Sequence, residues 1–94
     1  MFRYEVAHIR EQGVDLIIIR LKSSFKYENK TDQYAIISEL QLKASDAGLA
    51  GTVVPVWDNG GGQMGFIAPR SWHPFFKIIN LEFVTYNINK ELYW

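Results

Sequence analysis

Apolar and polar side chains alternate along the first part of the chain, which is typical of a β-strand with one buried face. Phe2 and Tyr4 alternate with charged residues, and Gly13 supplies a turn before a second apolar run. We therefore predict a β-hairpin over residues 2–21. The run Leu16–Ile19 is apolar on both faces. We expect it to be a central strand covered from both sides, or a strand with one face at an interface.

A helix is predicted over residues 31–47, because apolar residues recur there at spacings of three and four. Thr31 suits the N-cap, Asp32 suits the positive end of the helix dipole, and Gly48 suits the stop. The apolar stripe consists of Tyr34, Ile37, Leu40, Ala44 and Ala47. This stripe is expected to pack the helix onto a sheet.

A second hairpin is predicted over residues 52–69. Its first strand is β-branched and aromatic, and Pro55 within it indicates an edge strand or a bulge. A glycine-rich turn follows, and Met64–Ala68 forms the return strand.

The last quarter of the chain allows two interpretations. Aromatic and aliphatic residues recur at helical spacing over residues 73–88, with Pro74 in the first turn, which predicts a helix followed by an extended piece at 92–94. The β-favouring composition of residues 83–86 supports the alternative of a short helix near 72–78 and a strand near 81–88.

These elements predict an α+β fold in a single globular domain spanning residues 1–94. Two β-hairpins form a small sheet, and the helix over 31–47 and a C-terminal helix pack on one face of it, in a ββαββα-like order. The chain has 94 residues, which is the size of one domain.

Composition excludes several classes of protein. The formal net charge is zero, which argues against a uniformly basic nucleic-acid binder, and the absence of cysteine excludes disulfides and thiolate metal sites. No stretch approaches the length of a membrane span, and the N-terminus is charged at once, so we expect a soluble cytoplasmic protein. The two histidines, His8 and His73, lack metal-ligand spacing, and no catalytic motif is present. We expect no metal, no cofactor and no enzymatic activity.

Two neighbouring segments are the candidate binding surface. The first is a glycine-rich loop, whose backbone N–H groups are accessible to an anion, although no lysine follows it as in a phosphate-binding loop. The second contains arginine, tryptophan and histidine, and Arg and Trp often anchor interfaces. The candidate residues are Trp57, Asp58, Asn59, Gly60, Gly61, Gly62, Arg70, Trp72 and His73.

The function predicted first is a small interaction domain that binds another protein or a second copy of itself. Aromatic residues make up 15% of the chain, an amount that exceeds what one helical layer is expected to cover. The face carrying Ile17 and Ile19, or the region of Trp57 and Trp72, is then the interface.

Two alternatives remain open. The first is a single-stranded nucleic-acid-binding module in which Phe2 and Tyr4 stack on bases, flanked by Arg10 and Arg20. The second is a site for a small anionic ligand at the loop Gly60–Gly62, assisted by Arg70. The sequence predicts no membrane partner.

Overall fold

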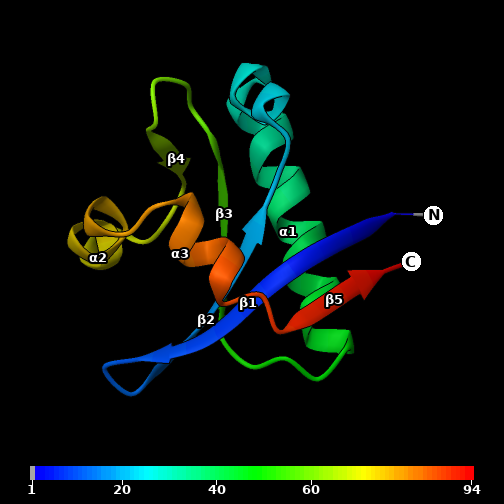
Figure 1. The fold of residues 1–94 in the computed structure, drawn as a ribbon. Helices are drawn as coiled ribbons and strands as arrows, with labels where there is room; N and C mark the ends of the chain where they lie inside the picture. Colours follow the sequence, from blue (N-terminus) through cyan, green and yellow to red (C-terminus); the bar gives the residue numbers. More distant parts are fainter. Residues whose placement is uncertain (1) are drawn as a thin grey trace.

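The computed structural model describes residues 2–94 and shows a five-stranded mixed sheet with helices on both of its faces (Figure 1). The strand order is β4-β3-β2-β1-β5, in which β2 and β3 are parallel and all other neighbours are antiparallel. The strands are β1 (Arg3–Glu11), β2 (Val14–Arg20), β3 (Thr52–Asp58), β4 (Met64–Phe66) and β5 (Lys90–Tyr93). The helices are η1 (Ser23–Tyr27), α1 (Lys30–Asp46), η2 (Arg70–Trp72), α2 (His73–Ile78) and α3 (Leu81–Tyr86). The predicted α+β class is confirmed.

The first hairpin forms as predicted. β1 pairs with β2 from Val6 opposite Ile19 to Glu11 opposite Val14, which leaves a two-residue turn. Both turn residues, Gln12 and Gly13, have positive φ angles of 51° and 77°. A turn of this kind follows the natural twist of a hairpin and therefore fixes the register of the two strands.

The predicted helix is also present, shifted by one residue. Its N-cap is Asn29 rather than Thr31, because the Asn29 side chain accepts a hydrogen bond from the Asp32 backbone N–H at 2.8 Å. At the other end Gly48 has φ of 81°, and the N–H groups of Gly48 and Leu49 donate to the carbonyls of Ser45 and Ala44. These two bonds form a Schellman stop, in agreement with the predicted role of Gly48.

The buried stripe of α1 differs from the predicted one at its ends. Tyr34 and Ala47 are exposed, whereas Leu40 and Ala44 are buried and Ile36 and Ile37 pack against them. The helix is therefore held by a shorter contact with the sheet, and its first and last turns contribute less to the core.

The two helical layers lie on opposite faces of the sheet, where the sequence analysis expected one face (Figure 1). Ile17 and Ile19 are buried in the cluster under α1, and Leu16 and Ile18 are buried in the cluster under α2 and α3. All four have no exposed surface. The apolar character of both faces of β2 is thus explained by a central strand covered from both sides, and Ile17 and Ile19 are not available as an interface.

The C-terminal segment is helical, but the single helix predicted over residues 73–88 is divided in two. The break falls at Ile79 and Asn80, whose backbones are extended, and the Asn80 side chain then caps α3 by accepting from the Phe83 N–H at 2.9 Å. The alternative of a strand near 81–88 is wrong. The extended piece expected at 92–94 is present as β5, which begins at Lys90.

The second hairpin is short, and part of the β3 backbone therefore has no partner in β4. β4 pairs only with Val56–Asp58, and the Pro55 carbonyl accepts from the Ile67 N–H at 3.2 Å, where that pairing ends. The missing N–H of Pro55 therefore falls on the side of β4, where pairing ends, and the ladder between β3 and β2 is unbroken, although β3 lies inside the sheet. Further along the same side, Gln41 of α1 bridges the backbone: its Nε2 donates to the Gly51 carbonyl at 3.0 Å, and its Oε1 accepts from the Val53 N–H at 2.9 Å.

We expect the Gln41→Ala variant to lose about 1–3 kcal/mol of unfolding free energy, because it leaves the partly buried Val53 N–H without its acceptor. Urea denaturation would measure the loss. Glu39→Ala, at an exposed position on the same helix, is the control and should change the stability by less than about 0.5 kcal/mol. Equal losses in the two variants would show that the Gln41 bridge contributes nothing.

Candidate functional site

The glycine-rich loop forms a closed turn at the tip of the second hairpin. The Asp58 carboxylate accepts a hydrogen bond from the Gly60 N–H at 2.9 Å, and the Gln63 N–H donates to the Gly60 carbonyl at 3.0 Å. Gly60, Gly61 and Gly62 all have positive φ angles, and a Cβ added at any of them would meet nothing within 4 Å. The predicted loop is present, but within residues 2–94 no hydrogen bond or ion pair joins it to Arg70.

The three aromatic side chains among the candidate residues, those of Trp57, Trp72 and His73, do not all lie on the same face of the sheet. Trp57 is buried on the α1 face, with its ring 5.3 Å from that of Phe25. Trp72 packs edge-on against Phe75 on the opposite face. His73 is partly buried, and its Nε2 donates to the Ala68 carbonyl at 3.0 Å. The structure therefore does not unite Trp57 and Trp72 in one surface.

The four residues of the nucleic-acid hypothesis do not converge either. Tyr4 packs on the α1 face, and its ring and that of Phe2, which directly precedes β1, both lie beside Trp94. Arg20 reaches Thr85 of α3 on the opposite face. Arg10 lies at the far end of the first hairpin, where its Nη1 is 3.8 Å from Asp15. Arg10 and Arg20 therefore do not flank the two aromatic rings.

Aromatic residues instead lie at the outer edge of the sheet, and we name Phe2, Tyr4, Tyr93 and Trp94 the aromatic edge. Phe2, Tyr4 and Trp94 lie on the α1 face, and Tyr93 points to the opposite face. The Trp94 ring centroid lies 5.4 Å from that of Tyr4 and 6.0 Å from that of Phe2. Lys43 of α1 places its Nζ 5.6 Å from the Trp94 centroid. Phe2 and Tyr93 remain 59% and 63% exposed. This edge carries aromatic surface that the core does not cover.

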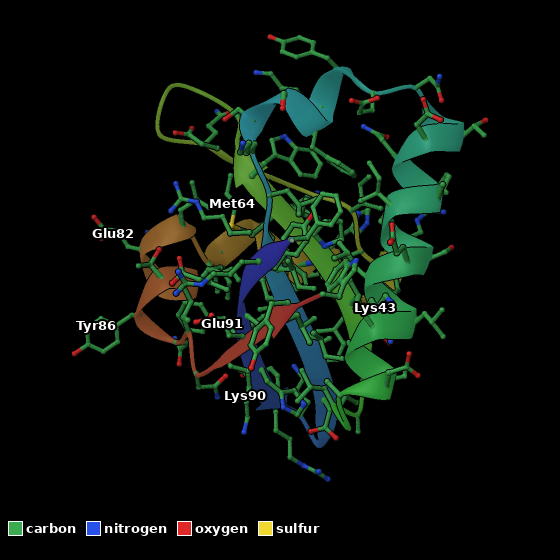
Figure 2. All side chains as sticks on the ribbon, turned by 90° about the vertical axis from the view of Figure 1, so that its right-hand side faces the viewer. Lys43, Met64, Glu82, Tyr86, Lys90 and Glu91 are labelled. Carbon is green, nitrogen blue, oxygen red and sulfur yellow. The ribbon has the colours of Figure 1, made fainter. Side chains whose placement is uncertain are left out.

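Within residues 2–94, no strand pairs with the outer side of β5. Phe2 and Trp94 exchange both backbone hydrogen bonds, at 2.7 and 3.1 Å, so Leu92 also points its N–H and C=O toward β1. Glu91 and Tyr93 therefore point theirs outward, and β5 is the last strand of the sheet. Figure 2 views the molecule from this side, with Lys90 and Glu91 labelled on β5.

The neighbouring part of β1 is closed by a side chain. β5 ends its pairing at Val6, and beyond it the Asn89 side chain accepts from the His8 N–H and donates to the His8 carbonyl, both at 2.9 Å. Gln41 closes β3 in the same manner. Open strand edges promote pairing with other chains. Two of them are covered by amide side chains here, whereas in the described part of the chain, residues 2–94, no side chain is hydrogen-bonded to the outer edge of β5.

An ion pair sets the electrostatics of this edge. The Arg3 Nε and Nη2 donate to the two carboxylate oxygens of Glu91 at 2.6 and 3.0 Å. The hydrogen bond from Arg3 lowers the pKa of Glu91, and the hydrogen bond with Glu91 raises the pKa of Arg3. The carboxylate on β5 is therefore already matched by a cation on β1.

This edge is not evident from the sequence. Phe2 and Tyr4 were expected on one strand and an extended piece at 92–94, but nothing in the sequence indicates that the two segments pair. The only signal is the alternation of Lys90, Leu92 and Trp94 with Glu91 and Tyr93, which is too short to place a strand in a sheet.

Comparison with protein-family models, curated proteins and solved structures found no match to this chain. Within residues 2–94, no three His, Asp or Glu side chains meet as metal ligands would. None of the helices in the same range has the length and apolarity needed to cross a membrane.

Proposed function

We propose that this chain is a non-catalytic interaction domain in which two copies associate by antiparallel pairing of their β5 strands. The observation that carries the proposal is the free outer backbone of Glu91 and Tyr93, which lies beside the aromatic edge. Addition of a strand to an open edge is a common mode of recognition, with backbone hydrogen bonds as its main contacts.

The charges along β5 favour a second copy as the occupant. Antiparallel pairing about Leu92 sets Glu91 of one copy opposite Tyr93 of the other, and Lys90 opposite Trp94. No like charges are then directly opposite, and a lysine facing a tryptophan is favourable. The Glu91 carboxylate is paired with Arg3, so it does not oppose strand pairing at this edge as an unpaired charge would.

The resulting dimer has two-fold symmetry and a sheet continuous across both copies. Its backbone contacts comprise about four hydrogen bonds, each with a net contribution of roughly 0.5–1.5 kcal/mol. The aromatic edge adds apolar contact. We expect an association of modest affinity, measurable at micromolar concentrations and above.

Two substitutions at Tyr93 test the proposal. Tyr93→Pro removes the outward N–H and leaves the bonds to β1 intact, whereas Tyr93→Val removes the same aromatic ring and keeps the N–H. In sedimentation velocity across a concentration series, the native chain and Tyr93→Val should associate, and Tyr93→Pro should remain monomeric.

Circular dichroism of both variants would verify that each keeps the native fold. A native chain that stays monomeric at high micromolar concentration would overturn the proposal. So would a Tyr93→Pro variant that is folded and associates as the native chain does. The cytoplasmic location expected from the sequence remains a prediction, which imaging of a tagged chain would test.

A further inference from the structure

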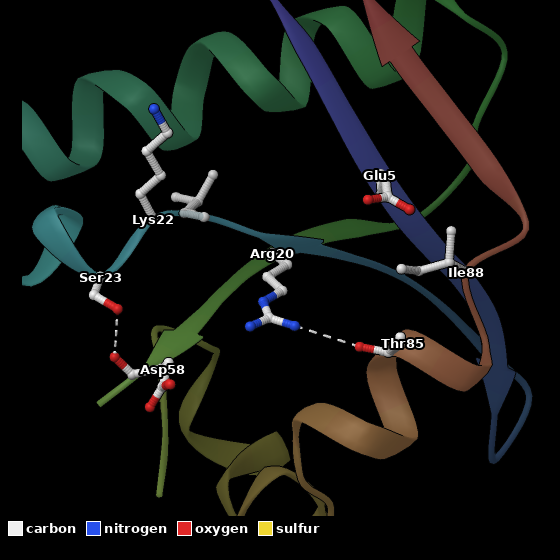
Figure 3. A pocket seen from close by; sticks show the side chains of 8 residues that line it. Glu5, Arg20, Lys22, Ser23, Asp58, Thr85 and Ile88 are labelled. Atoms are coloured by element: carbon white, nitrogen blue, oxygen red, sulfur yellow. Dashed lines mark hydrogen bonds between the residues drawn. The ribbon is translucent and has the colours of Figure 1, made fainter. Parts of the chain in front are cut away.

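A polar hollow lies at the carboxyl ends of the two parallel strands, β2 and β3. A cavity of about 420 Å³ opens there, between the ends of β2 and β3 and the side of α3 (Figure 3). The chain leaving β2 enters η1 on the α1 face, and the chain leaving β3 continues through β4 to α2 and α3 on the other face. In open α/β sheets, ligands bind where neighbouring connections diverge in this way.

The cavity contains opposite charges that are not paired with one another. Arg20 stands in its middle, with Glu5 of β1 on one side and Asp58 at the end of β3 on the other, and Lys22 also lines the cavity (Figure 3). Within residues 2–94 no carboxylate lies within 4 Å of the Arg20 guanidinium, whose one hydrogen bond is a 3.5 Å contact from Nη1 to the Thr85 hydroxyl. Most of its N–H donors therefore remain available to a ligand.

This arrangement suits a ligand that carries both charges. A simple anion would be attracted by Arg20 and Lys22 and repelled by Glu5 and Asp58. A simple cation would be attracted by the two carboxylates and repelled by Arg20 and Lys22. A zwitterion matches both kinds of charge. Its carboxylate binds the Arg20 guanidinium, and its ammonium group binds the carboxylate of Glu5 or Asp58. The volume of the cavity is large enough for a molecule of the size of an amino acid.

The adjoining surface adds a preference for the side chain of the ligand. A second hollow of about 490 Å³ shares Arg20 and Thr85 with the first and is lined further along α3 by Leu81, Glu82 and Tyr86. It is more apolar than the first, and the Tyr86 side chain projects from it, 93% exposed (Figure 2). An apolar side chain fits here while the charged groups of the same molecule bind beside Arg20.

We propose that the cavity at Arg20 binds a free α-amino acid with an apolar side chain. The site is independent of the β5 edge and of the proposed self-association. The ligand carboxylate binds Arg20, the ammonium group binds Glu5 or Asp58, and the side chain lies along α3 against Leu81 and Tyr86.

The test is an NMR titration of the ¹⁵N-labelled chain with L-leucine, acetate and isoamylamine, in which the last two each carry one half of the charge pattern. Leucine should produce saturable shifts in residues 20–23, 58 and 81–86, and the two half-ligands should not. The titration is repeated on Tyr93→Pro, so that the result does not depend on whether the native chain dimerises.

Arg20→Gln should weaken leucine binding about tenfold or more, and so should at least one of Glu5→Gln and Asp58→Asn, because each of these removes a charge-assisted hydrogen bond to the ligand. Arg10→Gln, at the distant end of the first hairpin, is the matched control and should leave binding unchanged. The proposal is overturned if leucine produces no saturable shift at these residues. Acetate or isoamylamine binding as tightly as leucine would also overturn it, since the site would then recognise a single charge.

Discussion

Replacing Phe76 with alanine should lower the unfolding free energy by about 3–5 kcal/mol, the largest loss we expect from a single truncation in this chain. Phe76 is 1% exposed, and its ring lies 5.5 Å from that of Phe66 and 5.2 Å from that of Phe75. It connects α2 to the sheet face that α1 does not cover. Truncation removes apolar burial and leaves a cavity that its neighbours cannot fill.

Urea denaturation followed by tryptophan fluorescence would measure the effect. Tyr86→Ala is the control in the same helical layer, and since Tyr86 is almost fully exposed it should change the stability by less than about 0.5 kcal/mol. If Phe76→Ala were as mild as Tyr86→Ala, the α2 layer would not pack on the sheet as described.

Gly51→Ala should be nearly as damaging, by about 2–6 kcal/mol, because two costs combine there. Gly51 has φ of 123°, a conformation almost restricted to glycine, and a Cβ at this position would lie 2.5 Å from the backbone oxygen of Asp15. Backbone atoms of β2 cannot move aside as a flexible side chain can. The link between α1 and β3 would therefore have to shift away from the sheet.

Gly48→Ala separates these two costs. Gly48 also has a positive φ, of 81°, but a Cβ there would contact nothing within 4 Å. Only the backbone strain of about 1–2 kcal/mol should appear. In thermal denaturation of the two variants, the stability of Gly51→Ala should be well below that of Gly48→Ala. Equal stabilities would show that the clash between the new Cβ and the Asp15 backbone is relieved without loss of stability.

Local patterns in the sequence were sufficient for the elements whose cause is local. The first hairpin, the helix ended by Gly48 and the second hairpin each depend on turn residues and on a regular spacing of apolar side chains, and all three were predicted. The prediction of a single C-terminal helix was wrong because Phe76, Ile79 and Phe83 have the spacing of one helical stripe. The cap formed by Asn80 interrupts that stripe, and the choice between one helix and two depends on packing against β2 and β3.

Long-range arrangement was beyond the sequence. The apolar character of both faces of Leu16–Ile19 allowed a strand covered from both sides, but it did not indicate which helix covers which face. For the candidate sites, the glycine loop was located correctly as a turn. The aromatic edge and the cavity at Arg20 each join residues far apart in the chain, such as Phe2 with Trp94 and Arg20 with Thr85. No local spacing reports such pairs.

The pairing of Phe2 with Trp94 also determines how the molecule would respond to force. The two ends of the described chain lie side by side (Figure 1), and β1 and β5 run antiparallel from that point. A load that pulls residues 2 and 94 apart acts on the Phe2–Trp94 pair first and then on each following pair in turn. The strands would unzip one bond at a time instead of sharing the load in shear. A single-molecule pulling experiment should therefore detach β5 at low force while the four remaining strands stay folded.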